Sequence, residues 1–257
     1  MVIQTAERSS HLDPSENVIF QRHMIAYNQA AKLINGTVLE IGCGEGYGIT
    51  ELAKYSEKYI GVDKFETNIS DDIKNNNNII FHKMEIPPLE NIEANSIDVV
   101  VTFQVIEHIQ EDHYFLEEIY RVLKPGGKLL LTTPNKLMSL SRNPWHIREY
   151  TPIEMNNILR KYFHSFKVNG VFGNDLVMEY YNKNKESVRK ITRFDIFNLQ
   201  YFMPRWFLKI PYDILNRFNR RRLKSNNEDI VNLVKVSDYS IKDSTDSCLD
   251  YFCIATK

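Results

Sequence analysis

The chain has few cysteines, no long apolar run and almost no excess charge of either sign. Among its 257 residues only Cys43, Cys248 and Cys253 carry a thiol, and their spacing matches no metal-binding motif. We therefore expect free thiols in a reducing compartment. No apolar stretch approaches the roughly 20 residues that cross a bilayer, and the N-terminal segment is too polar for a secretory signal. These absences predict a cytoplasmic protein.

The near balance of charge also disfavours one class of partner. The formal net charge is −1, so the composition gives no reason to expect nucleic acid as a partner. Hydrophobic residues make up 43% of the chain and charged residues 25%, as in ordinary soluble domains. A chain of this length can fold as one large domain or as one domain with an insertion.

The glycine-rich stretch at 42–48 lacks two features of nucleotide-binding loops. The dinucleotide fingerprint Gly-x-Gly-x-x-Gly, started at Gly42, would place its third glycine at Tyr47, whereas this chain has Gly44 and Gly46. No Gly-Lys-Ser/Thr sequence follows, so a phosphate-gripping loop is disfavoured as well. A nicotinamide cofactor is therefore not expected. A glycine turn between a strand and a helix still lets some ligand approach the backbone closely.

Alternating apolar strands and amphipathic helices predict an α/β fold. Strands are expected at 37–41, 58–63, 79–83, 96–103, 128–133, 166–171 and 249–256. Helices are expected at 18–34, 48–54, 111–123 and 152–162. The βα repeats are too few for an eight-stranded barrel, so we predict an open, doubly wound, Rossmann-like sheet of seven strands.

The stretch 176–247, between the last two expected strands, is too long for a hairpin. It is rich in apolar and aromatic residues and is interrupted by Pro204 and Pro211. We predict an inserted helical subdomain that forms a lid over the substrate. Residues 1–175 and 248–257 would then form the main ligand-binding domain.

Polar or aromatic side chains follow three of the expected strands, at the edge where open α/β sheets bind ligands. Asp63 ends the second strand about 20 residues after Gly42, where a carboxylate can accept hydrogen bonds from ribose hydroxyls. Met84 and Glu85 follow the third strand, where they could meet an adenine edge, and Phe103 ends the fourth. No basic residue in the glycine turn would balance phosphates. An adenosine with an amino acid tail therefore fits better than a nucleotide.

Five segments follow one another in the order and spacing of a known enzyme class. They are Leu39-Glu40-Ile41-Gly42-Cys43-Gly44-Glu45-Gly46, Asp63, Ile97–Val100, Val105–Ile109 and Arg121–Gly127. On these residues the chain resembles the class I S-adenosylmethionine-dependent methyltransferases, within a subgroup that includes ubiquinone-biosynthesis-like and glycan- or polysaccharide-modifying enzymes. Looser signals for the glycan subgroup are the run 143–151 (Asn-Pro-Trp-His-Ile-Arg-Glu-Tyr-Thr) and the sequence Arg22-His23-x-x-x-Tyr27.

The resemblance implies S-adenosylmethionine as the cofactor and the strand order 3-2-1-4-5-7-6, with the last strand antiparallel. Asp63 would hold the ribose, Met84 and Glu85 would flank the adenine, and Phe103 would lie near the methionine portion. One position departs from the class: Lys83 stands where an aspartate often contacts the adenine amino group. The implied cofactor-binding residues are Glu40, Gly42, Gly44, Gly46, Asp63, Met84, Glu85 and Phe103.

Methyl transfer to a hydroxyl needs near-attack geometry and a base, and two histidines are candidates for that base. His108 follows the fourth strand, and His146 lies in the run 143–151; an imidazole suits this task near neutral pH. For each histidine a purely structural role is the alternative. Arg148 and Glu149 are expected to form a structural ion pair.

A metal ion is not expected at this site. Some ubiquinone-type relatives bind a divalent ion through a Glu-x-x-Glu-His pattern, but Gln104 takes the place of the first glutamate before Glu107 and His108. Losing one carboxylate weakens a site for a hard cation.

The stretch 204–224 is strongly basic and aromatic. Its cations outnumber its single carboxylate, Asp213, and they alternate with residues such as Trp206 and Ile210. One interpretation is a peripheral contact with a membrane surface or with an anionic, lipid-linked acceptor. The other is a lid helix with a solvated basic end.

We therefore predict a methyltransferase that acts on a small-molecule acceptor, at a hydroxyl of a sugar or glycan precursor. One alternative is methylation of a lipid-like quinone or isoprenoid at a membrane surface. Another is a non-catalytic cofactor-binding or scaffold protein. The sequence does not indicate whether the protein forms oligomers.

Overall fold

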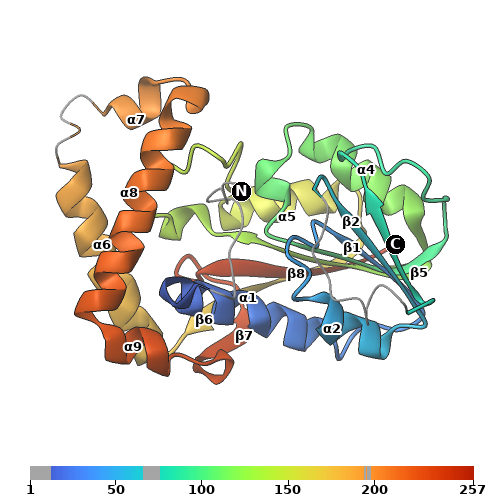
Figure 1. Cartoon of the computed structure of the whole chain (residues 1–257). Coiled ribbons are helices and arrows are strands. Elements are labelled where there is room, and N and C mark those ends of the chain that lie inside the picture. Colours follow the sequence, from blue (N-terminus) through green and yellow to red (C-terminus); the bar gives the residue numbers. More distant parts are fainter. Residues whose placement is uncertain (1–12, 66–75, 194, 196–197) are drawn as a thin grey trace.

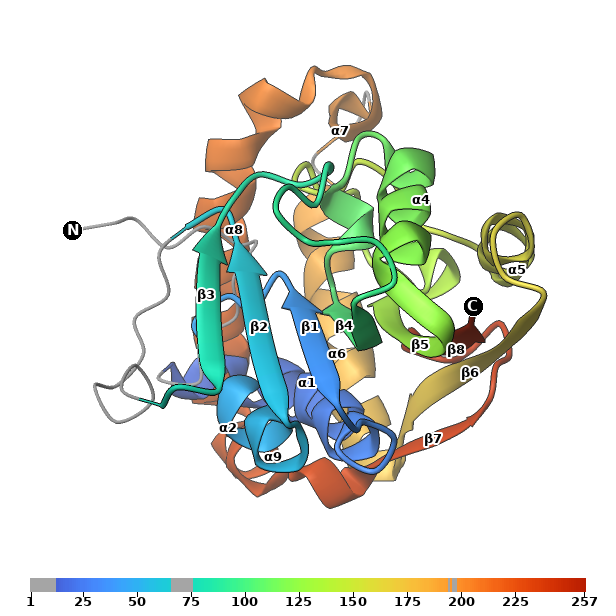
Figure 2. The ribbon, with the colours of Figure 1, turned by 90° about the vertical axis from the view of Figure 1, so that its right-hand side faces the viewer.

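The computed structural model describes residues 13–65, 76–193, 195 and 198–257. At the centre of this part of the chain lies an eight-stranded sheet in the order β3-β2-β1-β4-β5-β8-β6-β7 (Figures 1 and 2). The strands are β1 (Thr37–Ile41), β2 (Lys58–Asp63), β3 (Ile79–Lys83), β4 (Ile97–Phe103), β5 (Leu123–Pro134), β6 (Ser165–Gly173), β7 (Tyr239–Asp243) and β8 (Asp250–Thr256).

Helices cover both faces of the sheet, as the doubly wound prediction requires. On one face α4 and α5 pack against residues such as Leu39 and Ile41; on the other, α1 and α2 pack against Val38 and Tyr59. Neighbouring residues of β1 thus face opposite layers, and both layers are apolar. The helices are α1 (Asn17–Ala30), α2 (Ile49–Leu52), α4 (Asp112–Val122), α5 (Pro152–Arg160), α6 (Asp175–Thr192), α7 (Leu199–Phe202), α8 (Arg205–Asn226) and α9 (Glu228–Leu233).

Local sequence accounts for where these elements start. α5 begins with a capping box, because Glu154 N–H donates to Thr151 Oγ1 and Thr151 N–H donates to Glu154 Oε2 at 2.7 Å. Pro152 occupies the first turn, where a missing N–H costs nothing. The β-branched run of β4 forms a central, buried strand. Cys43, Cys248 and Cys253 are buried and form no disulfide with one another, as expected.

The predicted fold class and the order of the shared strands are confirmed, with one strand added. β3, β2, β1, β4 and β5 are parallel, and β8 is antiparallel between β5 and β6. The additional strand, β7, pairs antiparallel with β6 at the edge of the sheet, inside the stretch 176–247 that was predicted to be wholly helical. β7 has five residues and only Tyr239 is buried, so it carries little of the apolar pattern that marks a strand.

The described residues between 176 and 233 are mainly helical, as predicted. α6, α7, α8 and α9 gather at one end of the sheet, beside α1 (Figure 1). Leu223 of α8 and Val231 of α9 share an apolar core with Val18 of α1. No helix in the described part of the chain has the length and apolarity needed to cross a membrane.

Glu40 of β1 is a buried carboxylate that joins three elements. Tyr27 of α1 donates its hydroxyl to Glu40 Oε1 at 2.6 Å, and the Tyr59 hydroxyl of β2 donates to Oε2. Burial raises the pKa of Glu40, although the two hydrogen bonds act in the opposite direction. A buried carboxylate is tolerated only when it is hydrogen-bonded, so the tyrosines are part of the folded core.

We expect Tyr59→Phe to lower the free energy of unfolding by about 1–3 kcal/mol, because it leaves one buried oxygen of Glu40 without its donor. Urea unfolding followed by circular dichroism measures this change. The control is Tyr55→Phe, whose ring is 56% exposed. Equal unfolding midpoints for the two variants would contradict a stabilising role of this hydrogen bond.

Candidate active site

The glycine turn lies between β1 and α2, at the edge of the sheet where β1, β2 and β3 end (Figure 2). Gly42 and Gly44 both adopt positive φ, +80° and +56°. A Cβ on Gly42 would lie 2.3 Å from Val105 Cγ2, so this glycine is needed for packing. A Cβ on Gly44 would meet only open space apart from one carbonyl at 4.0 Å. Because Gly44 has no side chain, its backbone is exposed to an opening large enough for a ligand.

That opening is a cavity of about 300 Å³ at the carboxyl ends of the parallel strands. It joins the glycine turn to the residues that follow β2, β3 and β4. Six residues predicted for the site line this cavity: Gly42, Gly44, Asp63, Glu85, Phe103 and His108.

Asp63 is held in place by backbone donors. Gly44 N–H donates to Asp63 Oδ2 and Phe65 N–H donates to Asp63 Oδ1, each at 2.9 Å. A carboxylate oxygen has two lone pairs and accepts hydrogen bonds from hydroxyl groups as well as from N–H groups. The residue at the predicted ribose position is thus both oriented and able to accept hydrogen bonds.

Three residues predicted to contact the cofactor do not line the cavity. The carboxylate of Glu40 is engaged by Tyr27 and Tyr59. Gly46 N–H donates to the Cys43 carbonyl at 2.9 Å and closes the turn, while Met84 N–H donates to the Asp63 carbonyl at 3.0 Å. The predicted contacts of Glu40, Gly46 and Met84 with the cofactor stay predictions.

Aromatic residues from α1 form a wall that the strand pattern did not predict. The Tyr27 ring lies 5.0 Å from Phe103 and 5.6 Å from Tyr47, between ring centroids. Tyr27, Tyr47 and His23 all line the cavity. The sequence Arg22-His23-x-x-x-Tyr27 contains two of these wall residues. Its spacing alone does not indicate where the helix lies in the fold.

A second cavity, of about 260 Å³, lies next to the first. His23, Gln104 and His108 line both cavities, so these residues form the boundary between them. The second cavity is built by α1, the strand ends and the helices α6 and α8. Among its polar lining residues are Arg22, Glu107, Asn135, His146, Glu149, Asn184, Tyr212, Asn219 and Asp250.

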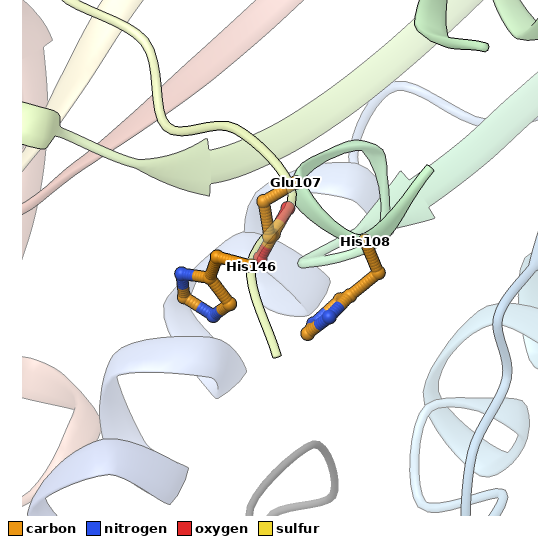
Figure 3. A group of neighbouring side chains, drawn as sticks. All are labelled: Glu107, His108 and His146. Atoms are coloured by element: carbon orange, nitrogen blue, oxygen red, sulfur yellow. The ribbon is translucent and has the colours of Figure 1, made fainter. Parts of the chain in front are cut away.

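Both predicted histidines lie beside the second cavity, with ring centroids 4.9 Å apart (Figure 3). His108 Nδ1 is 3.0 Å from the Trp145 carbonyl, and His146 Nδ1 is 2.5 Å from Glu149 Oε1. A carbonyl only accepts hydrogen bonds, so His108 carries its hydrogen on Nδ1 and keeps Nε2 as the basic nitrogen.

The predicted ion pair between Arg148 and Glu149 is wrong. Arg148 pairs with Asp112, which also accepts a hydrogen bond from the Tyr150 hydroxyl at 2.7 Å, while Glu149 binds His146. Asp112 begins α4, a distant element in the sequence, so adjacency along the chain gave no guide to the partner of Arg148.

Glu107 lies between the histidines and β5. It is buried, and its Oε2 accepts a hydrogen bond from Thr133 Oγ1 at 3.0 Å. Burial raises the pKa of Glu107 to about 7, against a lowering by nearby His146. Donor atoms of Glu107, His108 and His146 lie within 4.8 Å of one another (Figure 3), a set that could hold a divalent ion. The sequence-based prediction of no metal stays a prediction.

One buried acceptor in the second cavity has no partner in the described part of the chain. Arg22 Nε lies 3.1 Å from Asp250 Oδ2, and Asp250 is only 2% exposed. Asp250 Oδ1 makes no hydrogen bond to any described residue. Burial raises the pKa of Asp250, and Arg22 lowers it. This oxygen is itself buried behind the cavity lining, and a buried polar atom without a partner is rare in folded proteins.

Part of the chain matches a known family. Residues 39–131, which include the glycine turn, Asp63 and His108, match the family described as Methyltransferase domain. Over these residues the chain is similar to S-adenosylmethionine-dependent methyltransferases.

Relatives of known sequence agree with this assignment. A probable S-adenosylmethionine-dependent methyltransferase of Mycolicibacterium smegmatis is 37% identical over 169 residues, which cover 60% of this chain and 62% of that protein. One of Mycobacterium tuberculosis is 36% identical over 170 residues, covering 60% and 58%. The chain thus spans about three fifths of the length of these two relatives. The mitochondrial ubiquinone biosynthesis O-methyltransferase of Rattus norvegicus is 32% identical over 106 residues, covering 38% and 31%.

Two solved structures share the fold over most of their length. The YcgJ protein of Bacillus subtilis superposes with a TM-score of 0.52 at 16% identity, covering 91% of this chain and 98% of that one. An S-adenosylmethionine-dependent methyltransferase of Thermotoga maritima, described as a possible histamine N-methyltransferase, gives 0.52 at 18% identity, covering 93% and 92%. At these identities the likeness concerns the fold.

The first cavity fits the cofactor of this class. Gly44 leaves room against the backbone, Asp63 offers acceptors for ribose hydroxyls, and Phe103 and Ile86 supply apolar walls. No basic residue stands in the turn 42–48 to attract phosphates. A sulfonium with an adenosine and an amino acid end is compatible with such a lining.

We expect Asp63→Ala to weaken binding of S-adenosylhomocysteine at least about tenfold, or about 1.4 kcal/mol. The change removes the carboxylate acceptors and also frees the Gly44 N–H that they hold. Isothermal titration calorimetry measures the affinity. Asp243→Ala is the matched control, because that side chain is 85% exposed on β7. Undiminished binding by Asp63→Ala would remove this residue from the cofactor site.

The raised pKa of Glu107 predicts a pH-dependent loss of stability. The folded carboxyl holds its proton to about pH 7, compared with 4.5 for an ordinary glutamate, so the free energy of unfolding falls as pH rises through this window. Glu107→Gln should remove that contribution, and its stability relative to the native protein should increase with pH. Urea unfolding at several pH values, with the exposed Glu93→Gln as control, measures the difference. Parallel pH profiles for the native protein and Glu107→Gln would contradict it.

Proposed function

We propose that the protein transfers a methyl group from S-adenosylmethionine to a hydroxyl of a small-molecule acceptor, a sugar or glycan precursor bound in the second cavity. The observation that carries this proposal is a second cavity whose lining is rich in amide and carboxylate groups, among them Asn135, Asn184 and Glu149. A polyhydroxylated acceptor offers the donors that such a lining requires. We also propose that the enzyme resides in the cytoplasm, as the sparse cysteines suggest.

His108 is the proposed base, because it borders both cavities. The acceptor oxygen attacks the methyl carbon in line as the bond from that carbon to sulfur breaks, and S-adenosylhomocysteine leaves. The hydroxyl proton passes to His108 Nε2, while the Trp145 carbonyl holds the other ring nitrogen in orientation. The cofactor, when bound, supplies the electrophilic methyl group; the chain supplies alignment and the proton acceptor.

His146 is assigned a positioning role in this proposal. Glu149 binds its Nδ1, and its ring lies against that of His108. Ser139 also donates its hydroxyl to Glu149, so the loop after β5 is tied to this pair. His146 lines only the second cavity, whereas His108 lines both cavities. In this proposal His146 therefore lies farther from the cofactor than His108 does.

A second candidate function has an observation of its own. An apolar groove of about 230 Å³ adjoins the second cavity and is lined by Leu208, Pro211 and Leu215. A lipid-like quinone or isoprenoid would suit such a groove. The similarity to a protein named as a ubiquinone biosynthesis O-methyltransferase supports the same acceptor class.

We expect His108→Gln to lower kcat about 100-fold or more, because a positioned base contributes rate enhancements of that size. Binding of S-adenosylhomocysteine should stay within about twofold, since the ring only borders that cavity. Radiolabelled methyl transfer to a panel of sugar nucleotides and quinone precursors measures kcat. His113→Gln on α4 is the matched control, because its ring binds Tyr162 away from both cavities.

The panel also separates the alternatives. Transfer to quinone precursors alone would favour the second candidate. Tight S-adenosylhomocysteine binding without transfer to any acceptor would favour a non-catalytic cofactor-binding protein. Full activity of His108→Gln would overturn the assignment of the base while leaving the methyltransferase proposal in place.

A further inference from the structure

The helix α8 presents two unlike faces. Its inner face carries Leu208, Tyr212 and Asn219, which line the cavities, and Leu223, which is buried in the core. Residues four apart lie on one side of a helix. If the opposite side of α8 were in contact only with water, that side would be expected to carry polar residues.

The outer face is instead apolar and exposed. Trp206, Ile210, Ile214 and Phe218 follow one another at four-residue intervals, with exposed fractions of 74%, 71%, 64% and 61%. Phe202 of the neighbouring helix α7 is 80% exposed. Exposed apolar clusters of this kind mark interaction sites. We define the outer face as Phe202, Trp206, Phe207, Ile210, Ile214, Arg217, Phe218, Arg221 and Arg222.

Cations occupy the end of the same face. Arg217, Arg221 and Arg222 are exposed in the last turns of α8. The one carboxylate of this helix, Asp213, accepts a hydrogen bond from Trp145 Nε1 at 2.8 Å and is thereby engaged at the inner side. An aromatic and aliphatic stripe flanked by arginines is the pattern of a helix that lies in the surface of an anionic bilayer.

The charge distribution distinguishes a lipid surface from a second copy of the chain. A symmetric dimer built on this face would need both signs of charge on it, so that each arginine meets a carboxylate of the partner. The outer face offers arginines and no carboxylate. Anionic headgroups supply the missing charge, and the acyl region accepts the aromatic side chains.

A groove adjoins the second cavity, and none of the residues that define the outer face line it. It is lined by Leu208, Pro211 and Leu215 of α8, and Leu215 is also 47% exposed. Tyr212, Asn216 and Asn219 line both the groove and the second cavity. The same helix therefore borders the exposed apolar face, the groove and the proposed acceptor cavity.

We propose that the outer face of α7 and α8 docks on an anionic lipid surface. The docking stands on the exposed apolar residues and the arginines of this face.

Co-sedimentation of the full chain with vesicles tests the docking. We expect binding to vesicles of phosphatidylcholine and phosphatidylglycerol in equal proportion, little binding to pure phosphatidylcholine, and a decline as salt screens the arginines. No methyl acceptor is present, so a negative result here does not depend on whether the proposed function is correct.

Two pairs of variants make the test specific. Trp206→Ser with Ile210→Ser should lower the bound-to-free ratio at least about tenfold, whereas Ile153→Ser on α5, a residue 73% exposed, should not change it. Arg221→Glu with Arg222→Glu should abolish the preference for anionic vesicles, whereas Arg160→Glu on α5 should leave it. Titration with S-adenosylhomocysteine verifies that every variant keeps the folded cofactor site.

Two results would overturn the proposal. One is equal, weak sedimentation of the native chain with both kinds of vesicle. The other is a concentration-dependent dimer, seen by light scattering, that Trp206→Ser with Ile210→Ser dissociates while vesicle binding is absent; the outer face would then be an interface between copies.

Discussion

The hydrogen bond from the Gly44 N–H to the Asp63 carboxylate ties the glycine turn to the end of β2, and the rest of the site depends on that link. The Gly42 N–H also donates to the Val62 carbonyl at 2.7 Å, so two hydrogen bonds hold this segment of positive φ against the end of β2. Around this link the structure adds Val105, which packs on Gly42, and Tyr27, which closes the side. The hydrogen bond between Gly44 and Asp63 therefore helps to position the glycine turn within the first cavity.

The second organising feature is the shared wall between the two cavities. His23, Gln104 and His108 each touch both spaces. Burial, together with the guanidinium groups of Arg22 and Arg220, lowers the pKa of His23 to about 3, so this histidine stays neutral at the boundary. The first cavity has an exposed glycine backbone, and the second has amide and carboxylate groups in its lining. The two cavities meet at these three side chains.

Much of the first cavity could be predicted from the sequence, because its parts are local. Gly42, Gly44 and Asp63 lie at the ends of strands whose apolar runs are plain, and parallel strands bring those ends together. Glu40 shows the limit: it stands beside the glycines in the sequence, yet its side chain points into the core toward Tyr59. The second cavity could not be predicted, because pairs such as Arg22 with Asp250 join segments with no common sequence pattern. β7 was not predicted for a different reason: only its first residue is buried, so this edge strand shows almost no apolar alternation.

The position of β8 has a consequence for how the enzyme is made. β8 enters the sheet between β5 and β6, although it is the last strand in the chain, and its first residue is Asp250. During synthesis the glycine turn and Asp63 leave the ribosome before Asp250, so the link between Gly44 and Asp63 can form while the second cavity still lacks one of its carboxylates.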